Sequence, residues 1–424
     1  MSTGIPPTIT NVVCPFCSLL CDDLTASERN GRLKVGSKGC RRAARGFEYV
    51  GAAFSPQVGG KAASLDEAFA RSTQILRKSR QPLIAGMGTD VRGCQAALAL
   101  AERCGAIVDH MHGAAAMSNA LVLQSRGWMQ TTLTELRNRA DLIVFVGTDT
   151  RESHPRFYER CVWPQDALLN SRLKKRQIIY IGNPLKTGDG TSPGGRRPQV
   201  IACGRDEMSE ILGILLALQR GREPTTDGTL TGRRLASLRK LLARLRAARY
   251  GVFVWSAAEL DPGARDLVIH AICDLVVALN ESTRFAGLAL GGNDGGASCT
   301  NVTAWQSGYP GRVNFAGGAP QFDPHLHDAT AALESGAVDA LLWISSFEPD
   351  PGLPARSVPT IALTRPSRRI ARTAEVYIPI GTPGVDHAGT LFRTDAIVSL
   401  PLRGLRTVPP LSVHEALTRI RERL

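Results

Sequence analysis

The feature that most constrains the fold is an alternation of continuous apolar runs with helical patterns. Apolar runs at 82–86, 141–147 and 177–182 are typical of strands that are buried on both faces of a sheet. Helical periodicity occurs around them, at 65–79 and 91–104. Since strands that alternate with helices usually pair in parallel, this part of the chain is predicted to be α/β.

A second alternation follows a Gly- and Pro-rich stretch at 183–197. Its predicted strands are at 251–255, 284–290, 339–345, 360–364 and 376–380, and its predicted helices at 208–219, 233–250 and 264–280. A length of 424 residues suits two or three domains of about 150 residues each. We therefore expect a four-cysteine domain at 1–60, a first α/β domain at 61–200 and a second at 201–424.

The composition is that of a globular protein. The hydrophobic share, 43%, is large enough for a core, and no apolar run approaches the roughly 18 residues of a membrane span. Residues 1–13 lack the basic and apolar regions of a secretory signal, so we expect a cytoplasmic location and no membrane contact. In a reducing cytosol, six scattered cysteines are interpreted as buried thiols. They are Cys94, Cys104, Cys161, Cys203, Cys273 and Cys299.

The net charge is strongly positive, with 51 Lys and Arg against 38 Asp and Glu, a surplus of 13. Such a surplus favours an acidic partner, which includes nucleic acid, an anionic membrane surface and a polyanionic substrate or subunit. Aromatic residues make up only 5%, which argues against binding of single-stranded nucleic acid by stacked bases. A solvated basic surface explains the charge equally well.

The other four cysteines are clustered. Cys14, Cys17 and Cys21 follow a C-x2-C-x3-C spacing, and Cys40 comes shortly after them. Four thiolates on a short segment can ligate a 4Fe–4S cluster or a tetrahedral zinc ion, and Arg41 and its basic neighbour would offset the negative charge. The predicted metal ligands are these four cysteines. The residues alone leave a cluster, zinc and an empty site with free, buried thiols open.

Three further motifs point less directly to chemistry. His110 and His112 have ligand-like spacing but no evident carboxylate or cysteine partner, so they are interpreted as ordinary polar groups at a strand end. His154 follows the strand at 141–147, where ligands bind in open α/β sheets; lining a cleft and making a loop hydrogen bond are both open. The glycine-rich stretch 291–296 could cradle a phosphate, although it lacks the Lys-Ser/Thr of a P-loop.

The cysteine spacing ahead of two α/β units resembles the molybdopterin oxidoreductase superfamily. The segment 17–23, C-S-L-L-C-D-D, is similar to the B subunit of formylmethanofuran dehydrogenase. Further similar segments are 138–141, 154–156, Trp305 with 308–310, and 389–395, so the resemblance covers nearly the whole chain. It implies a molybdopterin-oxidoreductase-like fold, with a small N-terminal cysteine domain and two Rossmann-like parallel-sheet domains. The resemblance also leads us to expect that the superfamily's C-terminal β-barrel domain is lacking here, since in formylmethanofuran dehydrogenase a separate subunit carries it.

The chain departs from that family at its redox centre. The family places a Cys or selenocysteine, followed by His, just after a strand that ends in Val-Asp. Matched from Val108-Asp109 to Gln124, these positions are Ala115 and Ala116, which can neither ligate a metal nor move a proton. The family's active-site arginine is also missing from 288–305, which reads as a glycine-rich loop. The resemblance thus implies no molybdopterin or tungstopterin and no catalytic residue in this chain.

This pattern is similar to the B subunit of the formyltransferase/hydrolase complex of methylotrophs. In that family, formyl moves from formyl-tetrahydromethanopterin to a methanofuran analogue and is then hydrolysed to formate, in formaldehyde oxidation and one-carbon metabolism. The resemblance implies a non-redox structural subunit, whose partners are transferase, hydrolase and small subunits. The alternative is an active molybdenum or tungsten dehydrogenase subunit. Nucleic-acid binding rests on charge alone and is not expected.

Methanofuran-type carriers bear glutamates, which gives the basic residues a possible role. Arginine-rich segments lie at 41–42, 174–176, 196–197, 233–234 and 365–372. A cationic surface could hold the polyglutamate tail loosely, because exposed ion pairs are each worth only about 0–1 kcal/mol. The alternative is that these residues dock acidic faces of the partner subunits.

Overall fold

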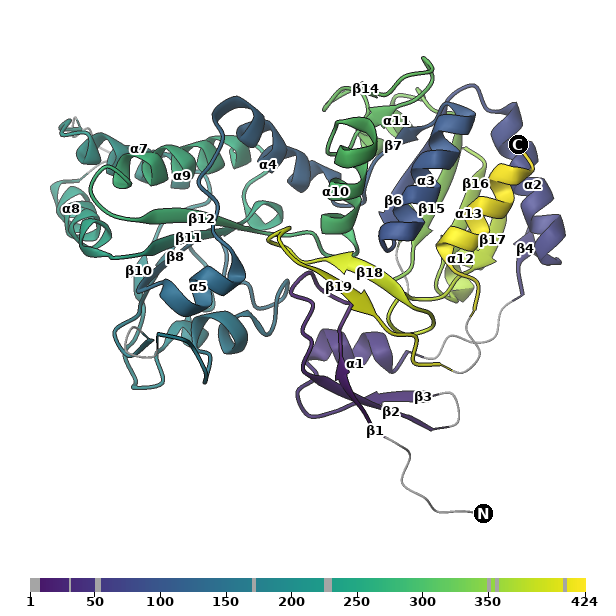
Figure 1. Ribbon diagram of the computed structural model, residues 1–424. Coiled ribbons are helices and arrows are strands. Elements are labelled where there is room, and N and C mark those ends of the chain that lie inside the picture. The colour runs from purple at the N-terminus through teal and green to yellow at the C-terminus, as the bar shows by residue number, and fades with distance from the viewer. Residues whose placement is uncertain are drawn as a thin grey trace. The chain divides into compact units, whose positions relative to one another are not determined.

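The computed structural model describes residues 8–29, 32–49, 55–169, 173–224, 231–348, 352–354, 358–406 and 410–424 (Figure 1). The chain forms two compact units. The first unit combines 1–117 with 292–424, and the second unit is 118–291. Within the described residues, no helix has the length and apolar character needed to cross a membrane.

The first unit is built on a nine-stranded sheet of order β14-β13-β7-β6-β15-β16-β17-β4-β5. The five strands from β7 to β17 pair in parallel, and the pairs at both edges are antiparallel. The strands are β4 (Gln57–Val58), β5 (Lys61–Ala62), β6 (Pro82–Gly88), β7 (Ile107–Val108), β13 (Val313–Asn314), β14 (Gln321–Phe322), β15 (Ala340–Ser345), β16 (Thr360–Thr364) and β17 (Val376–Pro379). The strand order reverses at β6, which has β7 on one side and β15 on the other.

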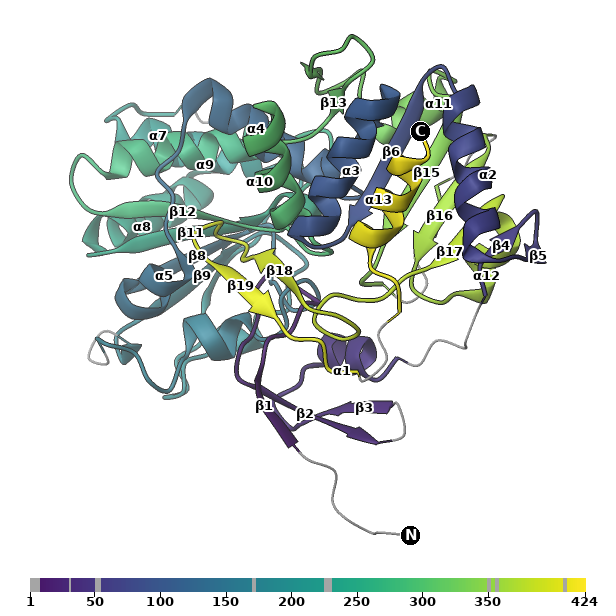
Figure 2. The same cartoon turned by 45° about the vertical axis from the view of Figure 1, so that its right-hand side comes forward.

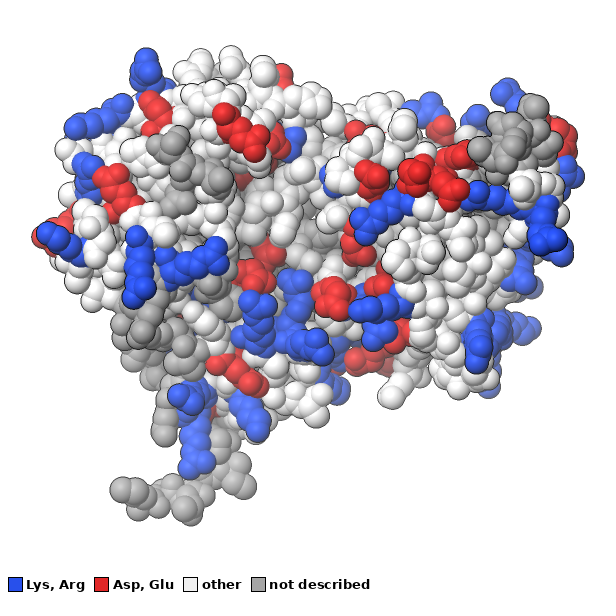
Figure 3. All heavy atoms as spheres, turned by 180° about the vertical axis from the view of Figure 1, so that it is seen from behind, with Lys and Arg blue, Asp and Glu red and all other residues white. Residues whose placement is uncertain are grey.

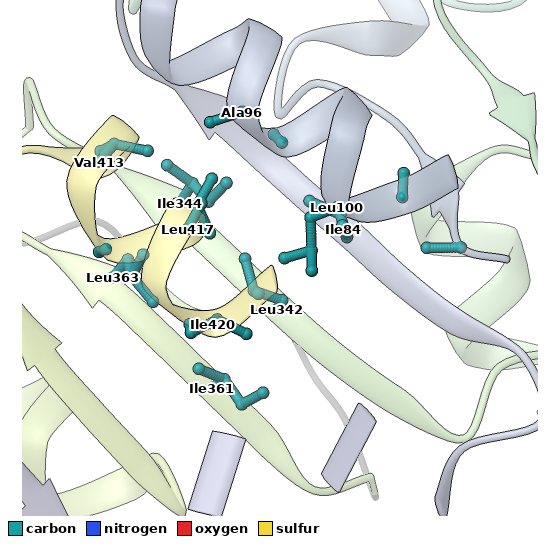
Figure 4. Close-up of a cluster of buried hydrophobic side chains, with 14 of the residues drawn as sticks. Ile84, Ala96, Leu100, Leu342, Ile344, Ile361, Leu363, Val413, Leu417 and Ile420 are labelled. Carbon is teal, nitrogen blue, oxygen red and sulfur yellow. The ribbon is translucent and has the colours of Figure 1, made fainter. Parts of the chain in front are cut away.

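Helices cover both faces of this sheet (Figure 2). On one face lie α2 (Leu65–Lys78), α3 (Val91–Cys104), α10 (Gly296–Ser307) and α13 (Val413–Glu422), and on the other α11 (Ala329–Glu334) and α12 (Arg368–Thr373). Because side chains alternate along a strand, Ile84 joins the first core while Leu83 and Ala85 join the second. Figure 4 shows Leu100 of α3 and Leu417 of α13 pointing into the first core.

Local sequence explains where these helices begin. Ser64 and Glu67 form a capping box at the start of α2, and Ser412 and Glu415 form another at the start of α13. In each box the serine hydroxyl accepts the N–H of the third helical residue, and the glutamate accepts the N–H of the serine. Asp90 caps α3 in a similar way, by accepting the N–H of Gly93. These caps fix where α2, α3 and α13 begin, and each of these helices packs its apolar face against the sheet.

The N-terminal part of the first unit is a three-stranded antiparallel sheet followed by a helix. The elements are β1 (Thr8–Val12), β2 (Leu24–Arg29), β3 (Arg32–Val35) and α1 (Arg41–Phe47). A hairpin of β18 (Gly389–Phe392) and β19 (Ser399–Leu402) connects this part to the larger sheet's helices. The Phe392 N–H donates to Ser298 Oγ of α10 at 2.9 Å, and the Thr394 N–H donates to the Ser18 carbonyl at 2.8 Å.

The second unit is a five-stranded parallel sheet of order β10-β9-β8-β11-β12. Its strands are β8 (Leu142–Val146), β9 (Gln177–Ile181), β10 (Gln199–Ile201), β11 (Gly251–Ser256) and β12 (Phe285–Leu290). The helices are α5 (Leu133–Arg139), α7 (Met208–Gln219), α8 (Gly232–Ala247) and α9 (Arg265–Leu279), and α4 (Gly113–Arg126) enters the unit from the first. Short helical turns are η1 (Tyr158–Val162), η2 (Gly188–Gly190) and η3 (Ala257–Glu259).

The predicted α/β class is confirmed, but the sheets do not follow the predicted boundaries. Residue 200 lies within β10, which pairs with β9 in the same sheet as β11 and β12. Strands β15 to β17, expected in the second domain, extend the sheet of β6. The order of elements along a chain does not reveal such pairings. The stretch 288–305, expected as a loop, is largely helical, because α10 begins at Gly296.

Candidate functional site

The loop that carries the first three clustered cysteines is closed by its own backbone. The Cys14 N–H donates to the Cys21 carbonyl at 2.8 Å, and the Leu20 N–H donates to the Cys17 carbonyl at 3.1 Å. Leu20 has a φ of +47°, so the turn passes through the left-handed region. Cys40 comes from outside the loop, as the N-cap residue of α1.

Phe16 holds this loop against α1. Its ring meets the Phe47 ring edge-on, with centroids 5.1 Å apart, and its carbonyl accepts a hydrogen bond from Arg42 Nε at 3.1 Å. A Cβ at position 46 would lie 2.4 Å from the Phe16 ring, so only glycine fits beneath it. Arg365 lies over the same ring, 5.7 Å from its centroid. The aromatic side chain between two cysteines thus anchors the loop.

Burial and mutual proximity raise the pKa of the clustered thiols. The pKa of Cys14 lies well above its usual value, first because the thiol is buried and then because Cys17, Cys21 and Cys40 are close enough to repel its thiolate. Burial also raises the pKa of Cys17 to about 11, although a backbone N–H and then Arg42 lower it. The four thiols therefore lie close enough for Cys17, Cys21 and Cys40 to affect the charge of Cys14.

The four cysteines fit a thiolate-ligated group in donor type. Sulfur donors are the ones that iron–sulfur clusters and structural zinc take from proteins. As thiols, however, they do not outline a metal position: over the described parts of the chain, no three His, Cys, Asp or Glu side chains are arranged to hold a metal ion. Cys14, Cys17 and Cys21 are buried and Cys40 is half-buried.

A second group of polar residues lies at the carboxyl ends of β6 and β7, where the strand order reverses. His110 and His112 follow β7, and Asp294 belongs to the glycine-rich turn before α10. His112 Nε2 lies 2.8 Å from Asp294 Oδ2, and His110 Nε2 lies 3.1 Å from the Asp294 carbonyl. The carboxylate partner that the sequence did not reveal is therefore Asp294. Crevices at such reversals are where open α/β sheets bind ligands.

The hydrogen bonds of His110 leave it neutral. Its Nδ1 accepts the His112 N–H at 3.0 Å, so the proton lies on Nε2, which donates to the Asp294 carbonyl. Burial, and then the charge of His112, lower the pKa of His110 to about 4. Burial of Asp294 favours its neutral form and is the largest single effect, but the hydrogen bond from His112 and the nearby charges of His112 and Arg42 together lower the pKa of Asp294. Because both ring nitrogens of His110 are engaged, it is not available as a metal ligand.

Glycine makes the turn beside this group possible. Gly295 has a φ of +75°, and a Cβ there would lie 2.2 Å from the Thr89 carbonyl oxygen. Asp294 also adopts a positive φ, +53°, which Asp tolerates better than most residues. The neighbouring Asn293 accepts the Ser18 N–H at 3.0 Å, so the turn contacts the cysteine loop. Glycine at position 295 thus allows the turn to pack closely against the backbone of Thr89.

Ala115 and Ala116 lie in the first turn of α4, three and four residues after His112. Ala115 is half-buried and Ala116 is exposed. Their methyl groups offer neither a lone pair nor a proton, so these positions cannot take part in metal or acid–base chemistry. The two histidines that precede α4, His110 and His112, contact Asp294.

His154 does not line an open cleft. It is fully buried after β8, where its N–H donates to the Thr150 carbonyl at 2.8 Å and its carbonyl accepts the Phe157 N–H at 2.9 Å. The neighbouring Arg156 is also buried and pairs with Glu159 at 3.0 Å. The backbone of His154 thus bonds within its loop, and the buried position of the side chain argues against the cleft-lining interpretation. Five of the six scattered cysteines are buried, and Cys104 is half-buried.

Two arginines from the predicted basic segments are buried, so the expectation that they contribute to an exposed surface is wrong. Arg365 is 1% exposed, and its guanidinium donates to the carbonyls of Phe347 and Gly46 at 3.0 and 2.9 Å. Arg176 is also 1% exposed and donates to carbonyls at the end of α5, including Ala140 at 2.7 Å. Backbone oxygens satisfy both cations.

Other arginines of these segments remain exposed, namely Arg41, Arg196, Arg197, Arg233, Arg369 and Arg372. The side chain of Arg368 lies outside what the structure describes. Figure 3 shows that, on the face it presents, Lys and Arg form several separate groups with Asp and Glu among them. The positive charge on this face is therefore not one continuous patch.

No family model matches the chain. Individual proteins do. The chain is 30% identical over 373 residues to the B subunit of Fhc, the formyltransferase/hydrolase complex of Methylorubrum extorquens, covering 87% of this chain and 97% of the relative. It is 25% identical over 421 residues to the B subunit of the tungsten-containing formylmethanofuran dehydrogenase 2 of Methanocaldococcus jannaschii, covering 95% and 94%.

A solved structure agrees with these relatives. The X-ray structure of the formyltransferase/hydrolase complex FhcABCD from Methylorubrum extorquens, in complex with methylofuran, contains a chain that matches with a TM-score of 0.72 and 29% identity, over 87% of this chain and 98% of that one. The fold and sequence thus define a homologue of the formylmethanofuran dehydrogenase B subunit. Within that class, the chain belongs to the family of formyltransferase/hydrolase complex B subunits.

Proposed function

We propose that this chain is the non-redox structural subunit of a cytoplasmic formyltransferase/hydrolase complex. The complex would convert formyl-tetrahydromethanopterin to formate through a methanofuran-type carrier, with transferase, hydrolase and small subunits as partners. The observation that carries the proposal is the pair Ala115-Ala116 in the first turn of α4, because alanine supplies neither a metal ligand nor a proton. The similarity to a subunit of a complex described with methylofuran supports the partners and the carrier.

The rival function is an active molybdenum or tungsten formylmethanofuran dehydrogenase subunit. Two relatives that are 25% identical to this chain are described as tungsten-containing, which is why the rival needs a test. The purified complex should catalyse formyl transfer to formate and contain no molybdenum or tungsten. Stoichiometric molybdenum or tungsten, with formate-dependent electron transfer, would decide for the dehydrogenase.

We further propose that Cys14, Cys17, Cys21 and Cys40 ligate a 4Fe–4S cluster. When bound, the cluster would act as a structural crosslink, because thiolate ligation couples metal binding to folding. The grouping of the four thiols supports the assignment; zinc and an empty site are its competitors. Iron and acid-labile sulfide at four each per chain in anaerobically purified complex would support the cluster. Zinc alone, or no metal, would exclude it.

The domain organisation that we propose keeps a molybdopterin-oxidoreductase-like plan, adjusted to the observed sheets. The cysteine-bearing segment within 1–60 precedes the strands of the nine-stranded sheet, and the five-stranded sheet is inserted between β7 and β13. Such an insertion of one α/β unit into another is consistent with the division of the chain into 1–117 with 292–424, and 118–291.

Exposed arginines are the proposed contact for the carrier's polyglutamate tail. Within the segment 365–372, Arg369 and Arg372 are exposed and can make this contact, whereas Arg365 is buried. In the whole complex, Arg369→Gln with Arg372→Gln should preserve assembly but reduce coupled formyl transfer and its salt sensitivity. Arg220→Gln with Arg222→Gln removes the same charge elsewhere and is the matched control. Dissociation of the complex would instead assign these residues to subunit docking, and unchanged turnover would refute their role with the tail.

A further inference from the structure

The second unit contains a cavity of about 450 Å³ at the starting ends of β9 and β10. Its lining includes Trp163, Ser192, Arg196, Arg197, Gln199 and Arg244. The two strands are parallel and adjacent, so their starting ends meet at one edge of the sheet. Small-molecule sites in proteins commonly have volumes of roughly 300–1,000 Å³. The cavity therefore has the size of a site for a small ligand.

The charge of the lining is entirely positive. Four arginines contribute to it, and no Asp or Glu does. No described carboxylate forms an ion pair with Arg176, Arg196, Arg197 or Arg244. Backbone carbonyls engage the guanidinium of Arg176. The guanidinium groups of Arg196, Arg197 and Arg244 repel one another, and a bound anion with several charges would relieve that repulsion.

Two of these arginines, Arg196 and Arg244, are held in place by their neighbours. Ser192 and Arg196 close a turn, in which the Ser192 N–H donates to the Arg196 carbonyl at 2.9 Å and the Arg196 N–H donates to Ser192 Oγ at 3.0 Å. The Arg196 guanidinium donates to the Lys174 carbonyl at 2.9 Å. On α8, Arg244 Nη1 donates to Gln199 Oε1 at 2.6 Å. Preorganised donors lose little side-chain entropy when a ligand binds.

Donors remain available after these contacts. A guanidinium carries five N–H donors, and the contacts of Arg196 and Arg244 engage only its terminal nitrogens. Arg197 makes no hydrogen bond or ion pair with any residue that the structure describes, and it is exposed. Trp163, whose Nε1–H donates to the Asp189 carbonyl at 3.0 Å, adds a rigid indole to the wall beside Ile178.

We infer that this cavity binds a small oxyanion with two or more negative charges, as in a phosphorylated or polycarboxylate metabolite. Arg197 would form a two-point contact with the anion, since guanidinium matches both phosphate and carboxylate groups. Arg196 and Arg244 would flank it, and Trp163 would contact its carbon skeleton. The site goes beyond the proposed function and does not depend on it. A cavity of about 450 Å³ that is partly open to solvent has room for a small ligand.

The test is calorimetric titration of the full chain with pyrophosphate and, separately, with citrate, at about 150 mM salt. Binding of either anion with a dissociation constant below about 1 mM is expected, weakening as salt rises. Arg197→Gln should weaken binding at least tenfold, and Arg197→Lys, which keeps the charge but loses the fork, by less. Arg222→Gln, an exposed arginine outside the cavity, is the control and should bind as the wild type does.

The two titrations distinguish the sources of the anion. Preference for pyrophosphate indicates a phosphorylated metabolite, and preference for citrate indicates a polycarboxylate. Binding of neither, or equal binding by Arg197→Gln and wild type, overturns the assignment. Binding of a tetraglutamate peptide while both small anions fail would also overturn it and would assign the cavity to an acidic polypeptide. Circular dichroism of each variant shows that a loss of binding is not a loss of fold.

Discussion

Two regions of the first unit differ in what they keep of the related redox family's chemistry: the four-cysteine segment and the turn that leads into α4. The cysteine loop and Cys40 keep four sulfur donors, three of them buried, whereas Ala115 and Ala116 stand where the related redox family has its metal ligand. In that turn the polar side chains bond to one another: His110 and His112 both contact Asp294. One region retains the means to bind a group, and the other has satisfied its polar atoms internally. A site can thus lose its chemistry without leaving buried polar groups unpaired.

The largest expected effect comes from the glycine turn that supports the second region. Gly295→Ala should lower the free energy of unfolding by about 3 kcal/mol or more, because it adds a clash with the Thr89 backbone to the strain of a positive φ. Gly308→Ala is the matched control: Gly308 has a φ of +85° with nothing near its would-be Cβ, so only strain, about 1 kcal/mol, is expected. Urea denaturation measures both. Equal losses would show that packing against Thr89 is unimportant.

The cysteine loop should respond to pH when it takes up metal. Because burial raises the pKa of Cys14 and Cys17, both thiols are protonated at neutral pH and must lose their protons to become ligands. Affinity for zinc should therefore rise with pH, by up to about tenfold per pH unit for each such thiol. Competition with a chelator at about pH 6.5 and 8.0 measures the slope. Cys161→Ser, outside the cluster, should leave the slope of zinc affinity against pH unchanged. A zinc affinity that does not depend on pH would contradict the proposed ligands.

The second region should show an acid-side loss of stability. The pKa of His110 falls from an ordinary 6.5 to about 4 in the folded protein, so unfolding takes up a proton between these values. The contribution of His110 is fully present above about pH 6.5 and is lost as pH falls toward 4, by at most about 3 kcal/mol. His110→Asn should flatten this dependence. The variant must be compared with the wild type because Asp109 acts in the opposite direction. Its pKa is raised to about 6, mainly by burial, so its contribution to stability increases as pH falls.

The smallest expected effect concerns the partly exposed pair. His112→Ala should destabilise the protein by about 1–2 kcal/mol, because it leaves the buried carboxylate of Asp294 without its partner. The double variant His112→Ala with Asp294→Asn should recover part of that loss, since the uncompensated charge is removed. Thermal unfolding at constant pH measures whether the double variant lies between the wild type and His112→Ala in stability. A double variant less stable than the sum of the single changes would refute the pairing.

Local patterns predicted the elements well, and long-range contacts poorly. The helix at 208–219 matches α7, and the run at 141–147 contains β8, because periodicity and apolar composition act within a few residues. The bond between His112 and Asp294 joins residues 182 positions apart, and no motif marks it. The clustered cysteines were found because their spacing is itself the motif.

Buried arginines were missed for a different reason. Arg176 and Arg365 stand in basic runs that are typical of a solvated surface, yet both lie in the interior. Their partners are mainly backbone carbonyls, which every residue supplies, so no acidic partner appears in the sequence. The same runs also contain exposed arginines, such as Arg372. Composition therefore indicated the total charge correctly but not its distribution.

The contact of Arg365 with Gly46 also has a consequence for the order of events during synthesis. The donor and the acceptor are 319 residues apart, and Arg365 also lies over the rings of Phe16 and Tyr49. The N-terminal segment leaves the ribosome first, but it gains this anchor only after most of the chain has been translated. Until then, we expect the four cysteines to be accessible to cellular factors that deliver metal. Maturation of the cysteine loop would thus precede its closure.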